Sequence, residues 1–312
     1  MDTAEAWAPA NIALVKYWGK RDEALVLPET DSLSVSLGSL GTRTRLARRS
    51  GPDTCTLNGA PVPPDSAFMQ RLRAFLDLFR LAPAAGFAVE TQNDVPTGAG
   101  VASSASGFAA LVLALDQLND WRLPPRALSV LARLGSGSAC RSLAPGFVHW
   151  HRGSAVDGLD SSGEVLPYRW PELRLGLVLV STAPKSESSR GGMRRTRETS
   201  ALYRTWPAQV AADLAHVLAA LPAHDFAALG AAAETNALAM HATMLAAQPP
   251  LCYWQPDSVA LMQRVWGLRR AGWPLYFTMD AGPNLKLLFP AADTARVVRE
   301  FPALTLITPF SP

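Results

Sequence analysis

A strand, a glycine-rich loop and an apolar helix follow one another directly between residues 86 and 118, and this segment constrains the fold most. The strand reads GFAVETQ, the loop NDVPTGAG and the helix SSASGFAALVLALDQL. Small residues such as Gly98 and Gly100 let a backbone approach a ligand closely, and a helix start offers unpaired N–H groups with a positive dipole end. Ser103 and Ser104 add hydroxyls for a phosphate or its magnesium ion. We therefore favour phosphate binding here, with an ordinary turn and a serine N-cap as the alternative. It is not a Walker A loop, because no Gly-Lys-Ser/Thr follows.

Strands and helices are interspersed elsewhere without a strict βαβ repeat, which indicates an α+β fold. In the first half, residues 33–37 and 42–46 alternate as half-buried antiparallel strands do. A helix from Pro64-Asp65 should place Phe68, Leu72, Phe75 and Phe79 on one face. A further short helix should run from Pro124-Pro125 to the glycines at 135 and 137.

The second half should begin with a strand over residues 173–182 and a polar, glycine-rich loop over 185–192. Three helical segments over roughly 193–270, the strands YFTMD and LKLLF, and a last helix and strand should follow. We expect two lobes, residues 1–172 and 173–312, with the boundary near 165–175.

The composition indicates a globular chain and excludes several kinds of partner. Hydrophobic residues make up 48% and charged residues 18% of the 312 residues, which is globular rather than disordered. The net charge of +3, without a run of like charges, argues against nucleic acid or an anionic membrane as partner. The N-terminal residues carry acids early and show no basic segment followed by an apolar one, so we do not expect them to be a signal peptide. No stretch approaches the roughly 18 apolar residues of a membrane span.

The cysteines and histidines indicate a reduced compartment and no metal centre. Cys55, Cys140 and Cys252 are scattered, as reduced thiols in a cytosol would be, so we expect a cytoplasmic protein. His149 and His151 would share one face of a strand, but the sequence shows no cysteine or carboxylate companion for them. We therefore expect no metal site built from protein ligands alone.

Lysine is rare in this chain, so its positions are informative. Only four lysines accompany 25 arginines, and Lys16 and Lys20 lie together in KYWGKR. This segment fits either an anion site or a solvated strand end. Lys185 lies in KSESSRGG, which fits either a lid that closes over phosphates or an exposed loop; the fourth lysine is Lys286.

Two further segments carry side chains suited to a small anionic substrate. In GSGSACRS, small hydroxyl residues stand beside Arg141, and a guanidinium can grip a planar carboxylate at two points. A helix C-terminal glycine with a surface arginine is the alternative. In DAGPN, Asp280 ends a strand; it is either a turn former or an acid that accepts a proton or orients a hydroxyl in a cleft.

Together and in this order, these segments resemble the diphosphomevalonate decarboxylases. The resemblance rests on APANIALVKYWGKRDEALVLP, NDVPTGAGVASSASGFAAL, GSGSACRSLAPGF, the SSRGGM loop with RETS after it, and MDAGPN, and it runs from about residue 7 to residue 289. The family belongs to the superfamily of galactokinase, homoserine kinase, mevalonate kinase and phosphomevalonate kinase. The resemblance implies that superfamily's two-lobed fold, with the active site in the cleft between the lobes.

The resemblance also implies a reaction with ATP and Mg2+. ATP would phosphorylate the 3-hydroxyl of mevalonate 5-diphosphate, and the new phosphate would leave as CO2 departs, which gives isopentenyl diphosphate, ADP and phosphate. A homodimer is implied as well. Magnesium should be carried by ATP, with Ser104 as the one protein oxygen expected beside it, rather than held in a protein-built cage.

Roles for individual residues follow from the same resemblance. Asp280 would orient or deprotonate the 3-hydroxyl, Arg141 and Ser138 would bind the C1 carboxylate, and Lys20 would be a further catalytic residue. The residues implied around the 5-diphosphate are Tyr17, Lys20, Arg21, Ser189 and Arg190. Those implied around ATP are Asn93, Pro96, Gly98, Gly100, Ser103, Ser104 and Lys185.

One departure from the family pattern concerns the substrate. Asp31 stands where the family commonly has Asn or Ser, and the Asp-Ser pair is more like relatives that act on mevalonate 5-phosphate. A carboxylate would repel a diphosphate unless a cation such as Lys20 or Arg21 intervened. We favour the diphosphate; the alternatives are a phosphomevalonate decarboxylase, a mevalonate 3-kinase and, more remotely, a non-catalytic nucleotide-binding protein.

Overall fold

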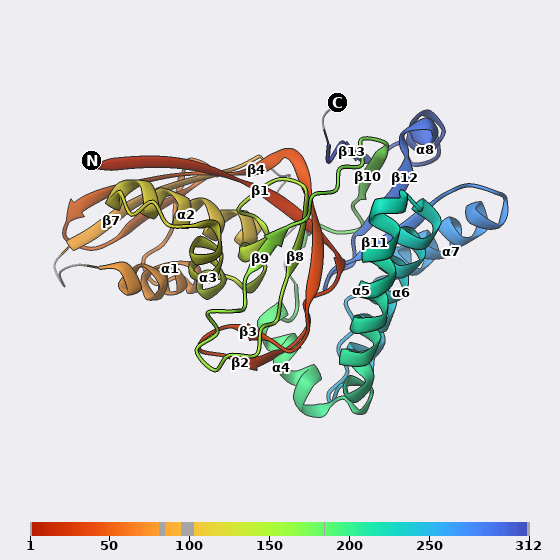
Figure 1. Ribbon diagram of the computed structural model, residues 1–312, viewed down its shortest axis with the longest axis horizontal. Coiled ribbons are helices and arrows are strands. Elements are labelled where there is room, and N and C mark those ends of the chain that lie inside the picture. Colours follow the sequence, from red (N-terminus) through yellow and green to blue (C-terminus); the bar gives the residue numbers. More distant parts are fainter. Residues whose placement is uncertain (1, 81–84, 95–102, 184, 311–312) are drawn as a thin grey trace.

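The computed structural model describes residues 2–80, 85–94, 103–183 and 185–310. Its elements form a mixed α+β structure in two halves, as the sequence predicts (Figure 1). In the first half, helices α1–α3 cover one face of a large twisted sheet. In the second half, two long helices lie beside a smaller sheet.

The large sheet takes its strands from the first 165 residues. Its strand order is β6-β5-β7-β4-β8-β9, with β1 paired to β4 off this path. Among the described strands of this sheet, the β5–β7 pairing is parallel and the other pairings are antiparallel. The strands are β1 (Thr3–Val15), β4 (Ser32–Ser50), β5 (Thr54–Leu57), β6 (Ala60–Pro61), β7 (Ala85–Asn93), β8 (Phe147–Trp150) and β9 (Gly163–Val165), and β2 (Lys20–Asp22) forms a separate hairpin with β3 (Leu27–Pro28).

Strand β4 is long enough to serve both halves of the molecule. Its second part pairs with β7, and there the buried Thr42 and Thr44 alternate with the exposed Arg43 and Arg45, as predicted. Its first part pairs with β8, and there the prediction of a half-buried strand was wrong, because Ser32, Ser34 and Ser36 are buried as well as the leucines. Ser36 meets the segment after α3, where its hydroxyl accepts a hydrogen bond from the backbone N–H of Gly146 at 2.8 Å.

The helices of the first half cover the sheet. Helix α2 (Ser103–Asn119) packs against β1 and β4 and also contacts α3 (Pro125–Gly135), so it is enclosed on several sides and its sequence is apolar all round. Helix α1 (Ala67–Leu76) begins at the N-cap Ser66 rather than at Pro64-Asp65. Its buried face includes Leu72 and Phe75, whereas Phe68, which was predicted on the same face, is 44% exposed.

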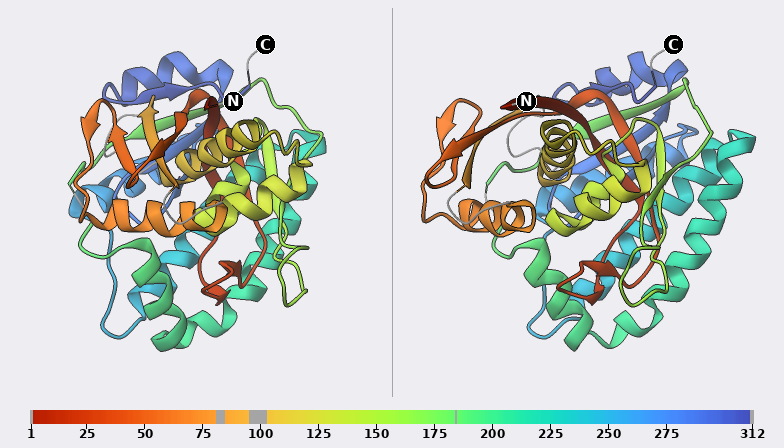
Figure 2. Two further views of the ribbon diagram at one scale, coloured as in Figure 1. Left: turned by 90° about the vertical axis from the view of Figure 1, so that its left-hand side faces the viewer. Right: turned by 60° about the vertical axis from the view of Figure 1, so that its left-hand side comes forward.

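The second half holds five α-helices among its described residues, one more than the three helical segments and the last helix that the sequence predicted, together with a four-stranded sheet. Strand β10 ends at Val178 rather than at residue 182, and the predicted hairpin of two strands is confirmed. Helices α5 and α6 lie side by side (Figures 1 and 2). The elements are β10 (Leu173–Val178), α4 (Ser189–Thr199), α5 (Trp206–Ala223), α6 (Phe226–Leu245), α7 (Pro256–Arg270), β11 (Tyr276–Met279), β12 (Leu285–Pro290), α8 (Thr294–Glu300) and β13 (Thr305–Ile307), with sheet order β11-β12-β10-β13.

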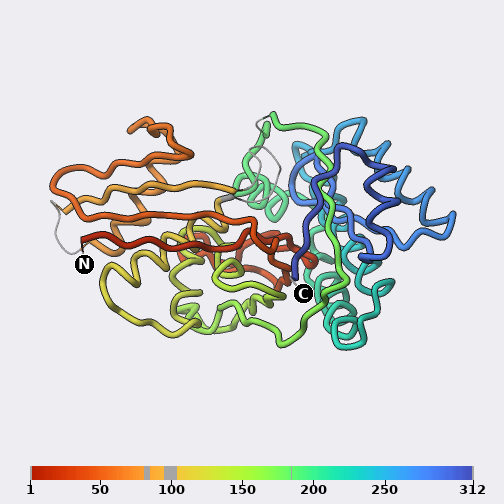
Figure 3. Tube along the Cα trace, turned by 90° about the horizontal axis from the view of Figure 1, so that it is seen from above, coloured from red at the N-terminus to blue at the C-terminus, as the bar shows by residue number. Residues whose placement is uncertain are grey.

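One hydrophobic core joins the two halves. Ile12 and Leu14 of β1 belong to the same buried cluster as Val217 and Leu221 of α5. Seen from above, the end of the described chain returns to the boundary between the halves (Figure 3), where Phe310 packs on Phe147 with ring centroids 5.0 Å apart. None of the described helices combines the length and the hydropathy that a membrane span requires.

Candidate active site

A cavity of about 300 Å³ lies where the two halves meet. It is lined by the end of β1 and the residues after it, by the starts of α2 and α4, by the 3-10 helix 137–141, and by the residues that follow β11. Its described lining holds one carboxylate, Asp280, and five cationic side chains, which are Lys16, Lys20, Arg71, Arg141 and Arg190. Such an excess of positive charge suits a ligand with several negative charges.

The single carboxylate is held between two lysines, and these three residues are called the inner end of the cavity. Asp280 follows β11, Lys16 follows β1, and Lys286 lies on β12. Lys16 Nζ is 2.9 Å from one oxygen of Asp280, and Lys286 Nζ is 3.0 Å from the other. Both lysine side chains are 2% exposed, whereas that of Asp280 is 30% exposed and faces the cavity.

The charges at the inner end shift the pKa values of its groups. Burial by itself raises the pKa of Asp280, but the ammonium groups of Lys16 and Lys286 outweigh this, so its pKa lies far below the usual range. Burial lowers the pKa of Lys16 to about 8, although Asp280 opposes this shift. At neutral pH the inner end therefore holds an ionised carboxylate and a charged Lys16.

Backbone and amide groups fix Lys16 in place. Its ammonium group also donates to the carbonyl of Ala13 at 2.7 Å, and its backbone N–H donates to the side-chain oxygen of Asn236 at 2.7 Å. Asn236, on α6, in turn donates to Asp213 on α5 at 2.8 Å. The long helices of the second half thus hold the end of a strand from the first half.

His241 supports Asp280 from beneath. Its Nε2 donates to the backbone carbonyl of Asp280 at 3.1 Å, and its ring stacks on that of Trp254 with centroids 5.1 Å apart. Burial lowers the pKa of His241 to about 3, so its ring is neutral at any ordinary pH. The imidazole therefore positions the backbone without adding a charge to the cavity.

Arg141 and Ser138 lie on the wall of the cavity, as predicted for a carboxylate site. Both come from the 3-10 helix 137–141, which Asn11 of β1 holds through hydrogen bonds to the carbonyl of Ser138 and the hydroxyl of Ser142. Arg141 is 3% exposed and donates through one terminal nitrogen to the hydroxyl of Ser32. Its Nε has no hydrogen-bond partner among the described residues, which indicates that a ligand supplies one.

The segment KYWGKR reaches the cavity from the turn after β1. Tyr17 and Lys20 both line it, and the buried hydroxyl of Tyr17 has no hydrogen-bond partner among the described residues. Lys20 Nζ lies 2.5 Å from Glu23, whose side chain is 49% exposed. Gly19, which lies between Tyr17 and Lys20 in the chain, has φ +104°, and a side chain there would collide with the side chain of Tyr203.

Helix α4 begins at the cavity, which corrects the prediction of a loop over residues 185–192. The helix starts at Ser189, because the hydroxyl of Ser188 caps it by accepting from the N–H of Gly191. Gly192 permits close packing, because a Cβ there would lie 2.7 Å from the hydroxyl of Tyr253. Ser189 and Arg190 both line the cavity, and with Lys20 they are called its outer end.

A second cavity, of about 520 Å³, adjoins the first and is mostly apolar. Four residues line both, which are Arg71, Ser104, Ser188 and Arg190. Asn93, predicted to contact nucleotide, lies on its wall and accepts from the hydroxyl of Thr42 at 2.7 Å. Pro96, Gly98 and Gly100 lie outside the described residues, and at Ser103 only the helical backbone is described.

Two predicted residues lie apart from the cavity wall. Arg21 is not among the lining residues; its guanidinium donates to the carbonyls of Arg152 and Gly153 at 3.2 and 3.4 Å. Lys185 donates to Ser189 at 3.5 Å, and its Nζ would lie 3.9 Å from a Cβ at Gly282. Lys185 thus lies near the outer end, beside the turn that follows Asp280.

Sequence reasoning missed several residues that build this cavity. Lys16 and Lys286 were noted for their rarity but given no role, and Asn11, Arg71 and His241 were not singled out. The rarity of lysine was the available signal, because two of the four lysines contact Asp280 and a third lies near it. Arg71 comes from α1 and carries no such signal.

Two family models together match most of the chain. The diphosphomevalonate decarboxylase-like N-terminal domain matches residues 8–163, and the mevalonate 5-diphosphate decarboxylase C-terminal domain matches residues 176–307. The curated diphosphomevalonate decarboxylase mvd1 of Aspergillus fumigatus is 36% identical over 323 residues, which cover 96% of this chain and 80% of that relative.

Solved structures of diphosphomevalonate decarboxylases also match this chain over nearly the whole fold. A structure of the mevalonate diphosphate decarboxylase from Enterococcus faecalis has a TM-score of 0.91 and 40% identity, and the match covers 98% of this chain and 96% of the other. A structure described as MDDEF in complex with MVAPP, AMPPCP and magnesium has a TM-score of 0.92 and 40% identity over the same shares. The chain described here belongs to the diphosphomevalonate decarboxylase family.

Proposed function

We propose that this chain catalyses the ATP-dependent decarboxylation of mevalonate 5-diphosphate to isopentenyl diphosphate, with ADP, phosphate and CO2 as the other products. The observation that carries the proposal is a cavity with one ionised carboxylate, Asp280, fixed by two buried lysines and faced by a surplus of cations. This arrangement fits a substrate that carries a hydroxyl, a carboxylate and a diphosphate. The family membership and the neighbour described with MVAPP and AMPPCP support the same reaction.

The residues present fit ATP and magnesium. The second cavity offers an apolar chamber for a base, and Arg71, Ser104 and Arg190 lie at its junction with the first cavity, where phosphates would pass. ATP supplies the phosphoryl group that turns the 3-hydroxyl into a leaving group, and magnesium neutralises the phosphates. Ser104 is the hydroxyl we assign beside the ion, and Asn93 and Lys185 are assigned to the nucleotide.

Asp280 orients the reacting hydroxyl. Because its pKa lies far below the usual range, it is a weak base, and its main action is to accept a hydrogen bond from the 3-hydroxyl and aim that oxygen. In a loose phosphoryl-transfer transition state the hydroxyl proton leaves late. The orientation of the hydroxyl oxygen therefore contributes more to the rate than the basicity of Asp280 does. Lys16 and Lys286 keep the carboxylate charged and immobile.

Arg141 and Ser138 hold the carboxylate that is lost. A guanidinium held by Ser32, with an unpartnered Nε, can grip a planar carboxylate and align its C1–C2 bond with the departing phosphate. A carboxylate stabilised only as an anion would resist loss of CO2. The alignment contributes instead because positive charge that develops at C3 draws the electrons of the C1–C2 bond.

The outer end binds the 5-diphosphate. Lys20 and Arg190 provide charge, Tyr17 and Ser189 provide hydroxyls, and the N-terminus of α4, which lies at the cavity, adds the positive end of a helix dipole. Lys20 would exchange its exposed partner Glu23 for a phosphate.

The placement of Asp31 favours the diphosphate over the monophosphate. Asp31 is not among the residues that line the cavity; its carboxylate instead contacts His149 at 2.9 Å and accepts from the backbone N–H of Arg152 at 2.8 Å. The Asp31 carboxylate is therefore paired outside the cavity and does not repel a diphosphate that is bound inside it. Arg21 is not needed as a compensating cation, although its contact with the carbonyl of Arg152 ties it to the same segment.

The test compares two substrates and two products in one assay. Purified protein is mixed with Mg-ATP and either mevalonate 5-diphosphate or mevalonate 5-phosphate, and ADP and CO2 are measured together. Equal amounts of ADP and CO2 with the diphosphate alone are expected. Turnover with the monophosphate alone would make this a phosphomevalonate decarboxylase, ADP without CO2 would make it a 3-kinase, and no ADP would mean a non-catalytic nucleotide-binding protein.

Three further properties extend the proposal. We assign residues 1–172 to an ATP- and phosphate-binding lobe and residues 173–312 to a lobe that supplies α4 and Asp280. The family resemblance favours a homodimer, which light scattering on the purified chain would test. Three free cysteines, two of them buried, fit a reducing cytoplasm.

A further inference from the structure

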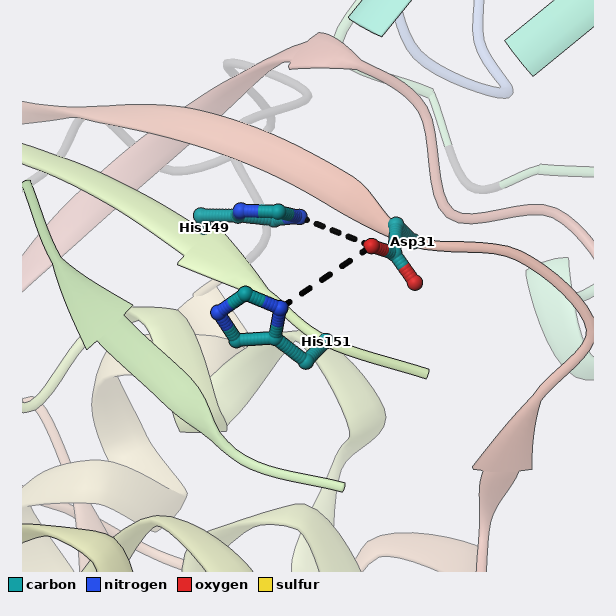
Figure 4. Close-up of side chains that lie close together, drawn as sticks. All are labelled: Asp31, His149 and His151. Carbon is teal, nitrogen blue, oxygen red and sulfur yellow. Dashed lines mark hydrogen bonds and ion pairs between the residues drawn. The ribbon is translucent and has the colours of Figure 1, made fainter. Parts of the chain in front are cut away.

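Asp31, His149 and His151 form a cluster (Figure 4), and none of the three lines the active-site cavity. The two histidines lie on and just past β8, two residues apart, so their side chains share one face and their ring centroids are 4.0 Å apart. One oxygen of Asp31 lies 2.9 Å from His149 Nε2 and 4.0 Å from His151 Nδ1. The carboxylate that the sequence alone did not place beside these histidines therefore comes from the turn before β4.

A second carboxylate determines which ring nitrogen of the neutral His151 carries the proton. Glu164, on β9, lies 2.7 Å from His151 Nε2. Because a carboxylate only accepts hydrogen bonds, Nε2 carries the proton of the neutral ring and Nδ1 is left with a lone pair. That lone pair lies 4.0 Å from the Asp31 oxygen that also contacts His149 Nε2 at 2.9 Å. An ion among these three atoms would displace the proton between His149 and Asp31 and would also bind the lone pair of His151.

The cluster has the size and access of a metal site. A tetrahedral ion with ligands about 2.0–2.1 Å away requires ligand atoms about 3.4 Å apart, and the separations of 2.9 and 4.0 Å lie on either side of this value. The backbone N–H of Arg152 holds the other oxygen of Asp31 at 2.8 Å and so orients the carboxylate. The side chains of Asp31 and His151 are 28% and 41% exposed, which leaves a path for an ion and a water ligand.

We propose that Asp31, His149 and His151 bind one divalent transition-metal ion of the Zn2+ type, with water as the fourth ligand. Glu164 is the outer partner that sets the tautomer of His151, as carboxylates commonly do behind metal-bound histidines. Two imidazoles and one carboxylate favour Zn2+, Co2+ or Ni2+ over Mg2+.

The ion would act on the fold beside the active site. Asp31 precedes Ser32, whose hydroxyl accepts from Arg141. An ion that ties Asp31 to β8 therefore also holds the start of β4 against that arginine. This is a structural clamp rather than a second reaction centre, because none of the three ligands lines the active-site cavity.

The experiment is a Co2+ titration of tag-free, chelator-treated full-length protein, followed by visible absorption and metal analysis. The exposed thiol of Cys252 is the competing soft ligand, so all proteins carry Cys252→Ser. We expect one Co2+ per chain, displaced by Zn2+ but not by millimolar Mg2+. Asp31→Asn and His151→Ala should abolish this binding, while His216→Ala, an exposed histidine on α5, should keep it.

Glu164→Ala gives a graded test, because loss of such an outer partner typically lowers metal affinity about 10–100-fold. Zn2+ should also raise the melting temperature of the parent protein and leave that of Asp31→Asn unchanged. Failure of the parent protein to take up Co2+ at equimolar concentration would overturn the proposal and leave a hydrogen-bonded Asp–His network. Equal binding by Asp31→Asn and the parent would overturn it as well.

Discussion

The inner and outer ends of the active-site cavity differ in how their charges are neutralised. At the inner end, Asp280 has two buried lysines as partners, so its charge is paired before any ligand arrives. At the outer end, the acid beside Lys20 is the half-exposed Glu23, and Arg190 is itself exposed. The inner end is therefore preorganised for chemistry, whereas the outer end gains a full set of partners only from an anionic ligand. Substitutions at the inner end should lower kcat, and those at the outer end should raise KM.

The largest effect is expected from Asp280→Asn. Loss of the carboxylate removes the acceptor for the 3-hydroxyl and leaves Lys16 and Lys286 facing each other, so turnover should fall by about 10²–10⁴-fold. ATP binding, measured by calorimetry, should persist. Asp257→Asn, an exposed acid in the first turn of α7, is the control and should behave as the parent. Survival of turnover in Asp280→Asn would show that the role assigned to it is wrong.

Arg141→Gln should separate the two halves of the reaction. Without the guanidinium the carboxylate is misaligned, and a misplacement on the order of 1 Å costs roughly 10²-fold in rate. We expect the ratio of CO2 to ADP to drop below one, with phosphorylation less affected than decarboxylation. Arg126→Gln, an exposed residue of α3, is the control. If CO2 and ADP stay equal in Arg141→Gln, Arg141 does not align the carboxylate.

Arg190→Gln should act on binding alone. The loss of one charge-assisted hydrogen bond at an exposed site should raise KM for the diphosphate roughly tenfold and leave kcat nearly unchanged. The control is Arg299→Gln on α8, far from the cavity. A fall in kcat at unchanged KM would contradict the division between the two ends.

The smallest effect is a pH dependence of the inner end. Because the pKa of Lys16 is about 8, raising the pH through this value neutralises one partner of Asp280, and kcat/KM should fall above about pH 8. The free energy of unfolding should instead rise over the pH range in which kcat/KM falls. Between pH 8 and the ordinary lysine pKa of 10.5, the unfolded chain binds more protons than the folded one, so the contribution of Lys16 to the free energy of unfolding rises with pH.

Rate profiles and denaturant titrations over this pH range check both trends. The Lys16→Met variant should lose the basic limb of the rate profile and the rise in stability. A basic limb that persists in that variant belongs to another group.

The sequence predicted individual strands and helices better than it predicted the contacts between segments that are far apart in the chain. The alternation of Thr42 and Thr44 with arginines, and the strand-to-helix passage from β7 to α2, were visible because they depend on neighbours in the chain. The burial of Ser36 was not, because its hydroxyl accepts from the backbone of Gly146, which lies more than 100 residues later in the chain. The start of α4 was missed because Gly191 and Gly192 were interpreted as a loop, although the preceding Ser188 is a good N-cap.

The candidate site shows the same division. Asp280, Arg141 and Ser138 were predicted from motifs that resemble a family. The pairing of Lys16 with Asp280 joins residues that are 264 positions apart in the chain, and no local sequence pattern predicts it. Arg71 reaches the cavity from a helix that looked like an ordinary amphipathic element. The placement of Asp31 against two histidines could not be seen from the sequence, because two segments more than 100 residues apart bring the groups together.

The neutral imidazole of His241 has a consequence for how the protein tolerates acid. Histidine is the side chain that ordinarily changes charge near pH 6.5, yet this one, whose ring contacts the backbone of Asp280, has a pKa of about 3. Asp280 titrates far below that range as well, and Lys16 only near pH 8. From about pH 5 to pH 7 the inner end thus keeps one constant protonation state. Mild acidification within this range would therefore leave Asp280 ionised, Lys16 charged and His241 neutral.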